Sequence, residues 1–449
     1  MRHEIEDALR TTLHVDVVGD EHLSSCFAVS DLLSASVAAV GNAASNLVAT
    51  LGLASSPPPV RVDQRLVSLW SARSIQPIGW DMPPVWDAVA GDYRTRDGWI
   101  KLHTNLPHHR RATLTVLDCR PERSAVAEAV AGWEAEALES TIVGERGVAA
   151  AMRSREEWAL HPQGTAVAAE PLIAWDADRP VAIRSWAGTR ERPLAGLRVL
   201  DLTRVIAGPV ATRTLAGFGA TVLRVDPPVW EEPNVVPDVT LGKRCARLRL
   251  DTNEGKAAFE DLLAGSDVLI HGYRPGALEG LGLGSDLRQR LAPALIEVTL
   301  DAYGWTGPWA SRRGFDSLVQ MSCGIADAGM AWAKREAPTP LPVQALDHAT
   351  GYLMAAAALT ALEKGVRGDG AVTARLSLAR TGDLLARHPA TAAGTLDVTP
   401  DPNDLSPTIE HTPWGDAHRL RAPLNIPDTA MRWDLPASAL GSAPARWPK

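Results

Sequence analysis

The chain has 449 residues, of which 45% are hydrophobic and 22% charged, a composition typical of a folded globular protein with two or three domains. Its formal net charge of −8 argues against a nucleic-acid-binding surface and provides no basic stripe for a membrane surface. The charged first residues form no signal-peptide core, and no apolar run is long enough to cross a bilayer. We therefore expect a cytoplasmic protein with no membrane partner.

The cysteines point to the same compartment. They lie far apart in the sequence and form no Cys-x-x-Cys pair, so we expect reduced, buried thiols. The four positions are Cys26, Cys119, Cys245 and Cys323.

The first quarter of the chain predicts a long helix and a strand. Residues 28–51 are rich in alanine and indicate a helix capped near Ser30 or Asp31. The run Ser-Ser-Pro-Pro-Pro at 55–59 indicates a linker or turn, and residues 60–70 favour a strand.

The next segment predicts a small mixed unit. Residues 91–104 indicate a hairpin around Asp97-Gly98, and residues 124–140 an amphipathic helix with Trp133 on its buried side. Residues 154–157 fit a capping box before a short helix that ends at His-Pro-Gln-Gly, 161–164. Residues 176–193 are the best candidate for a linker.

Residues 194–228 form the clearest unit of the sequence. Leu197 to Leu202 and Thr221 to Val225 are short apolar strands, and Val210 to Gly217 is the helix between them. This pattern predicts a parallel βαβ unit, whose ligands collect at the carboxyl ends of the strands. We therefore expect chemistry at the loop Thr203–Pro209. The loop is not a dinucleotide fingerprint, because it has one glycine.

Further motifs follow this unit in a recognisable order. They are a basic Gly-Lys-Arg at 242–244 and segments 247–284, 303–325 and 342–365. In this order, from about Pro193 to Ser377, the chain resembles the first half of the family III CoA-transferases, a group that includes formyl-CoA and carnitine-CoA transferases and α-methylacyl-CoA racemase. The resemblance implies an α/β fold: a Rossmann-like parallel sheet with helices on both faces, plus a smaller α+β domain.

A weak internal repeat bears on the domain order. The helix of 28–51 and the strand after it resemble residues 342–365 and the strand-like segment at 370–378. In the family, that helix lies mid-chain and precedes the small domain with its hairpin. Residues 1–190, with a small domain at about 75–145, therefore resemble a second half placed before a first half at 191–390. A circular permutation or a tandem fusion would explain this order, and chance similarity between alanine-rich helices is the rival explanation.

The remaining residues, 391–449, are rich in proline, alanine and aspartate. They predict an extended arm along the surface, with a short strand near 417–421.

Asp347 is the candidate catalytic residue. In the family, the nucleophile is an aspartate at the start of a helix after a proline-containing loop, and Pro-Val-Gln-Ala-Leu-Asp places Asp347 there. The resemblance implies that its carboxylate forms an acyl anhydride and then an aspartyl-CoA thioester. The alternative from the residues alone is a helix N-cap. Asp31 occupies the equivalent position in the repeat, and we interpret it as a cap or vestige. Asp316 is expected to play a supporting role.

Phe315 separates transfer from racemisation. The racemase branch carries a histidine at this position to form a two-base pair with the aspartate, and phenylalanine cannot exchange a proton. His348 is a poor substitute, because neighbours on a helix point about 100° apart. Transfer is therefore favoured over an α-methylacyl-CoA racemase-like isomerase.

The resemblance also implies a set of CoA-binding residues. Where formyl-CoA transferase-like members carry a glutamine, this chain has Ile206. Where they carry basic residues, this chain has Pro227, Asp251 and Gly280. Lys243, Arg244, Arg247 or Arg274 could compensate, or these cations could form a solvated face. The predicted cofactor-binding residues are Val205, Ile206, Ala207, Leu248, Tyr273, Ala277, Leu281 and Arg313.

Two other clusters favour structural interpretations. His103, His108 and His109 lack metal-ligand spacing, so we expect no metal. Trp70, Trp80, Trp86 and Trp99 could line a substrate pocket, but packing is the simpler role.

Together these inferences predict an acyl-CoA:carboxylate CoA-transferase that uses a CoA thioester as substrate and holds no tightly bound cofactor. Its partners would be an acyl-CoA, a carboxylic acid acceptor and a second copy of the chain, because the family forms interlocked homodimers. A catalytically degenerate homologue that binds CoA or a partner is the remaining alternative, supported by the missing basic positions.

Overall fold

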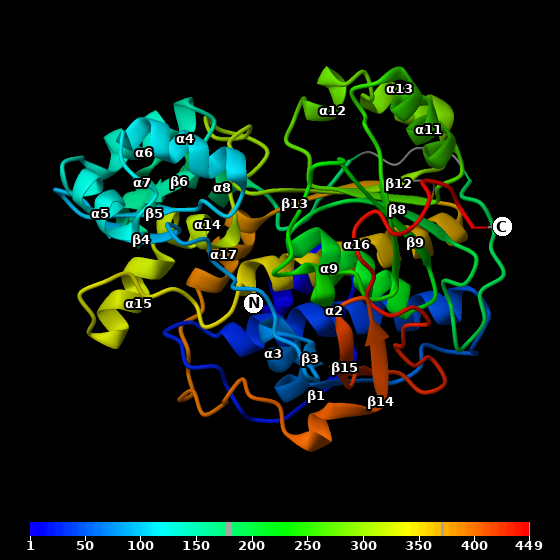
Figure 1. Cartoon of the computed structure of the whole chain (residues 1–449). Helices are drawn as coiled ribbons and strands as arrows, with labels where there is room; N and C mark the ends of the chain where they lie inside the picture. Colours follow the sequence, from blue (N-terminus) through cyan, green and yellow to red (C-terminus); the bar gives the residue numbers. More distant parts are fainter. Residues whose placement is uncertain (177–181, 370–371, 449) are drawn as a thin grey trace.

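A seven-stranded sheet forms the centre of the protein (Figure 1). The computed structural model describes residues 1–176, 182–369 and 372–448. The strand order is β10-β9-β8-β11-β12-β13-β7, in which the first six strands are parallel and β7 is antiparallel at the edge. The order reverses between β8 and β11, as it does in doubly wound nucleotide-binding sheets. The bounds are β7 Ala174–Trp175, β8 Arg198–Leu202, β9 Thr221–Asp226, β10 Lys243–Arg247, β11 Val268–His271, β12 Ile296–Asp301 and β13 Thr373–Ser377.

Helices cover both faces of this sheet, as predicted. On one face α9 (Ala207–Gly217) and α16 (Ala345–Arg367) pack on the strands, and α2 (Val29–Thr50) packs on α16. On the other face lie α11 (Asn253–Ala264), α12 (Ala277–Gly280) and α13 (Ser285–Leu291), at the top of Figure 1. Alternate residues such as Val199 and Leu200 enter the two separate cores, which explains why each strand is apolar throughout.

The small domain has its own sheet and core. Strands β4 (Gly91–Arg94) and β5 (Trp99–Leu102) form the predicted hairpin around Asp97-Gly98, and β6 (Ala149–Ala151) pairs with β5. The expected single helix at 124–140 is instead two, because the chain breaks near Trp133, whose side chain still packs against this core. The helices are α4 (Pro107–Leu117), α5 (Arg123–Ala131) and α6 (Ala135–Gly144).

Two local predictions are wrong for identifiable reasons. The strand expected at 60–70 extends only over β2 (Val60–Asp63). The Asp63 side chain accepts a hydrogen bond from the Leu66 N–H (3.0 Å) and so caps a helix, α3 (Gln64–Ala72), which takes up the remaining residues. The N-cap of α2 is Ala28, so neither Ser30 nor Asp31 caps it.

The prediction for 154–164 is confirmed. The capping box of Ser154 and Glu157 begins α7 (Arg155–Leu160), this helix ends before His161, and Pro162 then opens a further helix, α8 (Pro162–Ala169). Proline suits the first helical turn, where its missing N–H is not needed. In the predicted linker 176–193, residues 177–181 lie outside the described residues, and 182–193 contain no helix or strand.

The internal repeat has a structural counterpart. The unit α2–β2–α3 recurs as α16–β13–α17 (Leu378–Ala386), and α2 and α16 lie side by side. The N-cap residues of the two long helices have nearly the same backbone angles, φ −73° and ψ 62° at Ala28 against φ −74° and ψ 66° at Gln344. Asp31 and Asp347 are each the third residue of their helix.

The long apolar helix α2 belongs to the core. By length and composition it could cross a membrane, but 83% of its most apolar window is buried inside the protein. It packs mainly on α16.

The C-terminal segment is more ordered than the expected arm. After a 3-10 turn (Pro402–Asp404), β14 (Leu405–Thr412) and β15 (Gly415–Leu420) form a hairpin that pairs with β3 (Ile75–Pro77). The short β16 (Leu424–Asn425) and β1 (Val15–Val18) flank β2. The remaining helices are α1 (Arg2–Leu9), α10 (Val236–Val239), α14 (Asp316–Ser322) and α15 (Ile325–Ala333).

Candidate active site

A cavity of ≈ 570 Å³ lies at the carboxyl edge of the large sheet. Its walls include the segments that follow β8, β11, β12 and β13, together with residues of the small domain such as His109. The cavity lies between the loops that follow the neighbouring strands β8 and β11, because the strand order reverses there and these two loops diverge. The predicted loop 203–209 therefore does line the principal cavity.

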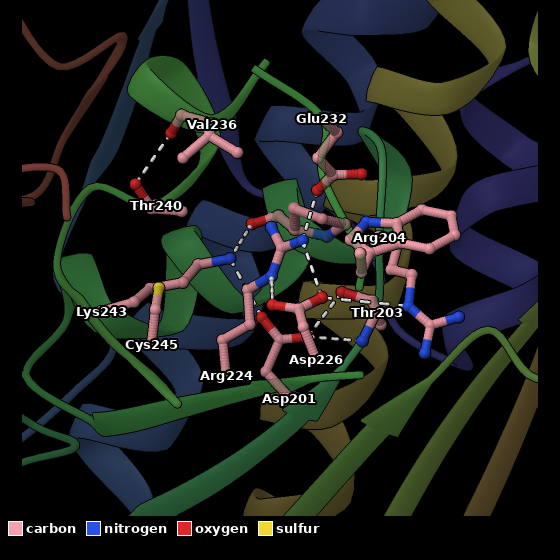
Figure 2. A network of polar contacts seen from close by, with 12 residues as sticks. Asp201, Thr203, Arg204, Arg224, Asp226, Glu232, Val236, Thr240, Lys243 and Cys245 are labelled. Atoms are coloured by element: carbon pink, nitrogen blue, oxygen red, sulfur yellow. Dashed lines mark hydrogen bonds and ion pairs between the residues drawn. The ribbon is translucent and has the colours of Figure 1, made fainter. Parts of the chain in front are cut away.

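A buried polar network holds this loop (Figure 2). One oxygen of Asp201 accepts hydrogen bonds from the Thr203 N–H (2.8 Å) and hydroxyl (2.5 Å). The other accepts from Thr212 (2.5 Å) and from Lys243 (3.0 Å), which also donates to the Pro209 carbonyl (2.9 Å). Burial alone would raise the pKa of Asp201, but the charges of Lys243 and Arg224 bring it below its usual value.

A second part of the network fixes Val205. Arg224 pairs with Asp226 (2.9 Å) and Glu232, and Glu232 accepts the Val205 N–H at 2.9 Å. Val205 has φ 65°, an unusual conformation for a β-branched residue. The hydrogen bond from its N–H therefore holds a strained turn in place.

Arg204 turns from this loop toward the cavity. Its guanidinium lies over the rings of Trp230 (4.6 Å) and Tyr273 (5.1 Å) and donates to the Tyr273 hydroxyl (2.9 Å). Asp226 is its ion-pair partner at 3.8 Å.

Asp347 lies in the first turn of α16, where the large cavity meets a smaller one of ≈ 100 Å³. The N-cap is Gln344, so the interpretation of Asp347 as a cap is wrong. The residue is 7% exposed. Burial, followed by the charge of Asp316, raises its carboxyl pKa well above the usual value, whereas a hydrogen bond from the Ala207 N–H lowers it.

Asp316 positions the start of this helix. Its carboxylate accepts the Asp347 N–H (2.9 Å) and the Gln320 amide, and Gln320 in turn accepts the Leu341 N–H (2.7 Å). Burial raises the pKa of Asp316 to about 6. These contacts fit the supporting role expected of Asp316.

A close approach of two helices brings the Ala207 N–H to Asp347. A Cβ added to Gly351 of α16 would lie 2.3 Å from the Ala207 carbonyl oxygen and 2.9 Å from the Val210 Cβ. Only glycine allows α9 and α16 to pack this tightly.

The predicted CoA-binding residues all line adjoining cavities. Val205, Ala207, Tyr273, Ala277, Leu281 and Arg313 line the large cavity, and Ile206 lines the small one. Leu248 lines a third cavity of ≈ 440 Å³ that shares Arg204, Tyr273 and Leu281 with the large one.

Phe315 lies between two buried histidines. The His103 ring stacks on it (centroids 4.0 Å apart, 6° between planes) and His109 meets it edge-on at 6.0 Å. Burial lowers both imidazole pKa values to about 3, so these rings are neutral. Within the described ranges, no group of three His, Cys, Asp or Glu side chains could hold a metal ion.

His348 points elsewhere. It lines neither cavity at Asp347, and burial followed by the charge of Arg213 lowers its pKa to about 3. Its position agrees with the expectation that it does not pair with Asp347.

The cations at the site agree only in part with those proposed to compensate for the missing basic positions. Lys243 is buried against Asp201 and Arg247 pairs with Glu231, whereas Arg274 lines the large cavity. Sequence reasoning missed Arg204 and Arg312, although Arg204 lies inside the loop already singled out. It also missed Trp230, and it assigned His109 a structural role and not a place at the cavity.

Comparisons with known proteins show which family part of the chain resembles. The sequence model described as CoA-transferase family III matches residues 194–410. An acetyl-coenzyme A transferase of Hypoxylon pulicicidum is 35% identical over 59% of this chain and 42% of its own length. The probable fatty acyl-CoA transferase Rv3272 of Mycobacterium tuberculosis is 35% identical over 38% of this chain and 46% of its own.

Further relatives have related names. The β subunit of succinyl-CoA–L-malate CoA-transferase of Chloroflexus aurantiacus is 37% identical over 39% of this chain and 46% of its own. A crystal structure of Rv3272 has a TM-score of 0.40 with 34% identity, covering 44% of this chain and 57% of that one. The chain thus spans less than half the length of these curated relatives. Its similarity to CoA-transferase family III covers residues 194–410, just under half of the chain.

Proposed function

We propose that the protein transfers CoA from an acyl-CoA to a carboxylic acid, with Asp347 as the nucleophile. The observation that carries this proposal is the position of Asp347, whose side chain lines both the large cavity and the small one. A thioester whose CoA portion occupied the large cavity and whose acyl group occupied the small one would present its carbonyl carbon to this carboxylate.

The chemistry follows from a buried carboxylate beside backbone donors. The Asp347 carboxylate attacks the thioester carbonyl, the C–S bond breaks, and an acyl-aspartyl anhydride and CoA thiolate result. The thiolate attacks the aspartyl carbonyl, which releases the acyl carboxylate and leaves an aspartyl-CoA thioester. The acceptor carboxylate then attacks this thioester, and the thiolate attacks the acceptor's carbonyl in the second anhydride, so that CoA ends on the acceptor and Asp347 is restored.

The surroundings of Asp347 suit these steps. A raised carboxyl pKa makes the ionised form a better nucleophile, and the first turn of α16 provides a favourable field for negative charge. The Ala207 N–H already donates to this carboxyl group and can stabilise charge that develops there.

Cations and aromatic rings support binding of a phosphate-bearing ligand. Arg274 and Arg313 line the large cavity, and within the described residues neither has a carboxylate at ion-pair distance. Guanidinium groups bind phosphates through paired hydrogen bonds. We place the phosphates near these two arginines and the nucleoside near Leu248 and Tyr273.

The test compares Asp347→Asn with Asp31→Asn, which changes the same helical position of the repeated unit but lines neither cavity at Asp347. The proteins are incubated with acyl-CoA, trapped with hydroxylamine or borohydride, and mapped by mass spectrometry. Wild type and Asp31→Asn should carry a label at residue 347 and transfer CoA, and Asp347→Asn should do neither. A label elsewhere, or transfer by Asp347→Asn, would contradict the proposal.

The isomerase alternative rests on His109, an imidazole that lines the same cavity as Asp347. Wash-in of deuterium at the α-carbon without exchange of CoA would favour it. Absence of both reactions, together with no binding of CoA by calorimetry, would favour a degenerate homologue.

A further inference from the structure

The small cavity at Asp347 has walls suited to an apolar group. Aromatic and aliphatic side chains from five parts of the chain converge there: the segment before the small-domain sheet, the segment after β5, the loop after β8, the segment after β9 and the residue before α14. Among them are Val85, Trp86, Leu106, Val205, Ile206, Trp230, Val235 and Phe315.

The charged side chains that the structure places in the lining of this cavity are all acidic. Its lining includes the carboxylates Glu231, Glu232, Asp316 and Asp347 and, among the residues the structure describes, no lysine or arginine. The cations nearby already have partners: Lys101 lies over the Trp86 ring and pairs with Asp92 (2.9 Å), Arg224 pairs with Glu232, and Arg247 pairs with Glu231. A second carboxylate on the acyl chain would therefore meet no unpaired cation in this lining, and burying a charge without a partner is unfavourable.

The size of the cavity restricts its occupant further. Its volume is ≈ 100 Å³, whereas a dry protein cavity of about 150 Å³ holds a benzene molecule. A short aliphatic chain fits this space better than a ring or a long fatty acyl chain.

We propose that the acyl group is short and uncharged, held between Trp86, Ile206 and Phe315. This inference rests on the proposed CoA transfer and adds its substrate class. It sets the chain apart from the succinyl-CoA–L-malate CoA-transferase that it resembles over part of its length.

The first experiment measures kcat/KM of the wild-type chain for CoA transfer from butyryl-CoA, succinyl-CoA and octanoyl-CoA to one common acceptor. Butyryl-CoA should exceed each of the others by at least about tenfold, which corresponds to about 1.4 kcal/mol. Equal or better use of succinyl-CoA would overturn the inference while leaving transfer through Asp347 intact. No transfer from any donor and no label at residue 347 would instead contradict the proposed function.

A variant and its control test whether the Trp86 side chain sets the preference for a short acyl group. Trp86→Ala removes a side chain that is 38% exposed, and should raise the ratio of octanoyl-CoA to butyryl-CoA use. Trp332→Ala, at a tryptophan 50% exposed on α15 and away from both cavities, is the matched control and should leave that ratio unchanged. A ratio unmoved by Trp86→Ala would contradict the placement of the acyl group.

Val85→Arg adds the missing cation. Val85 is 47% exposed, so the longer side chain can keep contact with water. The ratio of succinyl-CoA to butyryl-CoA use should rise by at least about tenfold. An unchanged ratio would show that the charge of the lining does not select the acyl group.

Discussion

The carboxylate of Asp316 accepts a hydrogen bond from the backbone N–H of Asp347 over 2.9 Å, and its charge is the second cause, after burial, of the raised Asp347 pKa. Asp316→Asn keeps an oxygen that can accept this hydrogen bond but removes the charge. The Asp347 pKa should then fall, and the acidic limb of the kcat/KM profile for CoA transfer should move to lower pH.

Asp316→Ala serves as the comparison, because it removes both the acceptor and the charge. It should lower kcat well below that of Asp316→Asn, since the helix start loses its anchor. A pH profile of Asp316→Asn that coincides with the wild-type profile would contradict the assigned coupling.

Asp347→Asn should stabilise the folded protein at neutral and alkaline pH. A carboxyl group whose pKa is raised on folding costs stability above its folded pKa, and this cost disappears as the pH falls below the unfolded value near 3.8. Urea unfolding at pH 8 and pH 4 should show a gain that is larger at pH 8.

Lys243→Met should destabilise the protein strongly. It leaves the buried Asp201 carboxylate without its closest cation, and breaking one side of a buried pair costs about 3–5 kcal/mol. In urea unfolding, the double variant Lys243→Met/Asp201→Asn should recover part of this loss, because the uncompensated charge is removed. No recovery would show that Lys243 stabilises the protein through contacts other than this pair.

Gly351→Ala should disrupt the site rather than strengthen its helix. Replacing glycine by alanine inside a helix ordinarily gains about 1 kcal/mol, but here the new Cβ would lie 2.3 Å from the Ala207 carbonyl oxygen. The displacement of Ala207 should reduce both the thermal midpoint and kcat. Gly280→Ala in α12, whose Cβ would meet nothing within 4 Å, is the control and should lower neither.

Much of this architecture could be predicted from local patterns. The βαβ unit at 194–228, the hairpin at Asp97-Gly98 and the first-turn position of Asp347 depend on periodicity, turn residues and motif order, all of which are local. The strand predicted at 60–70 is too long, because the alternation of apolar and polar residues in β2 stops at Asp63. Beyond Asp63, the apolar residues Leu66, Leu69 and Trp70 have helical spacing.

What could not be predicted depends on contacts between distant segments. The C-terminal hairpin β14–β15 gains its third strand from residues 75–77, and nothing near either segment indicates the pairing. In the same way, Trp86 and His109 reach the cavities beside Asp347 only through the packing of the small domain on the large sheet.

The side-by-side packing of α2 on α16 has a consequence for behaviour in dilute solution. Both helices belong to one polypeptide, so their association is a first-order process with a fixed effective concentration. Dilution cannot separate them as it separates subunits. The support that α2 gives to the helix carrying Asp347 is therefore the same at nanomolar as at millimolar protein.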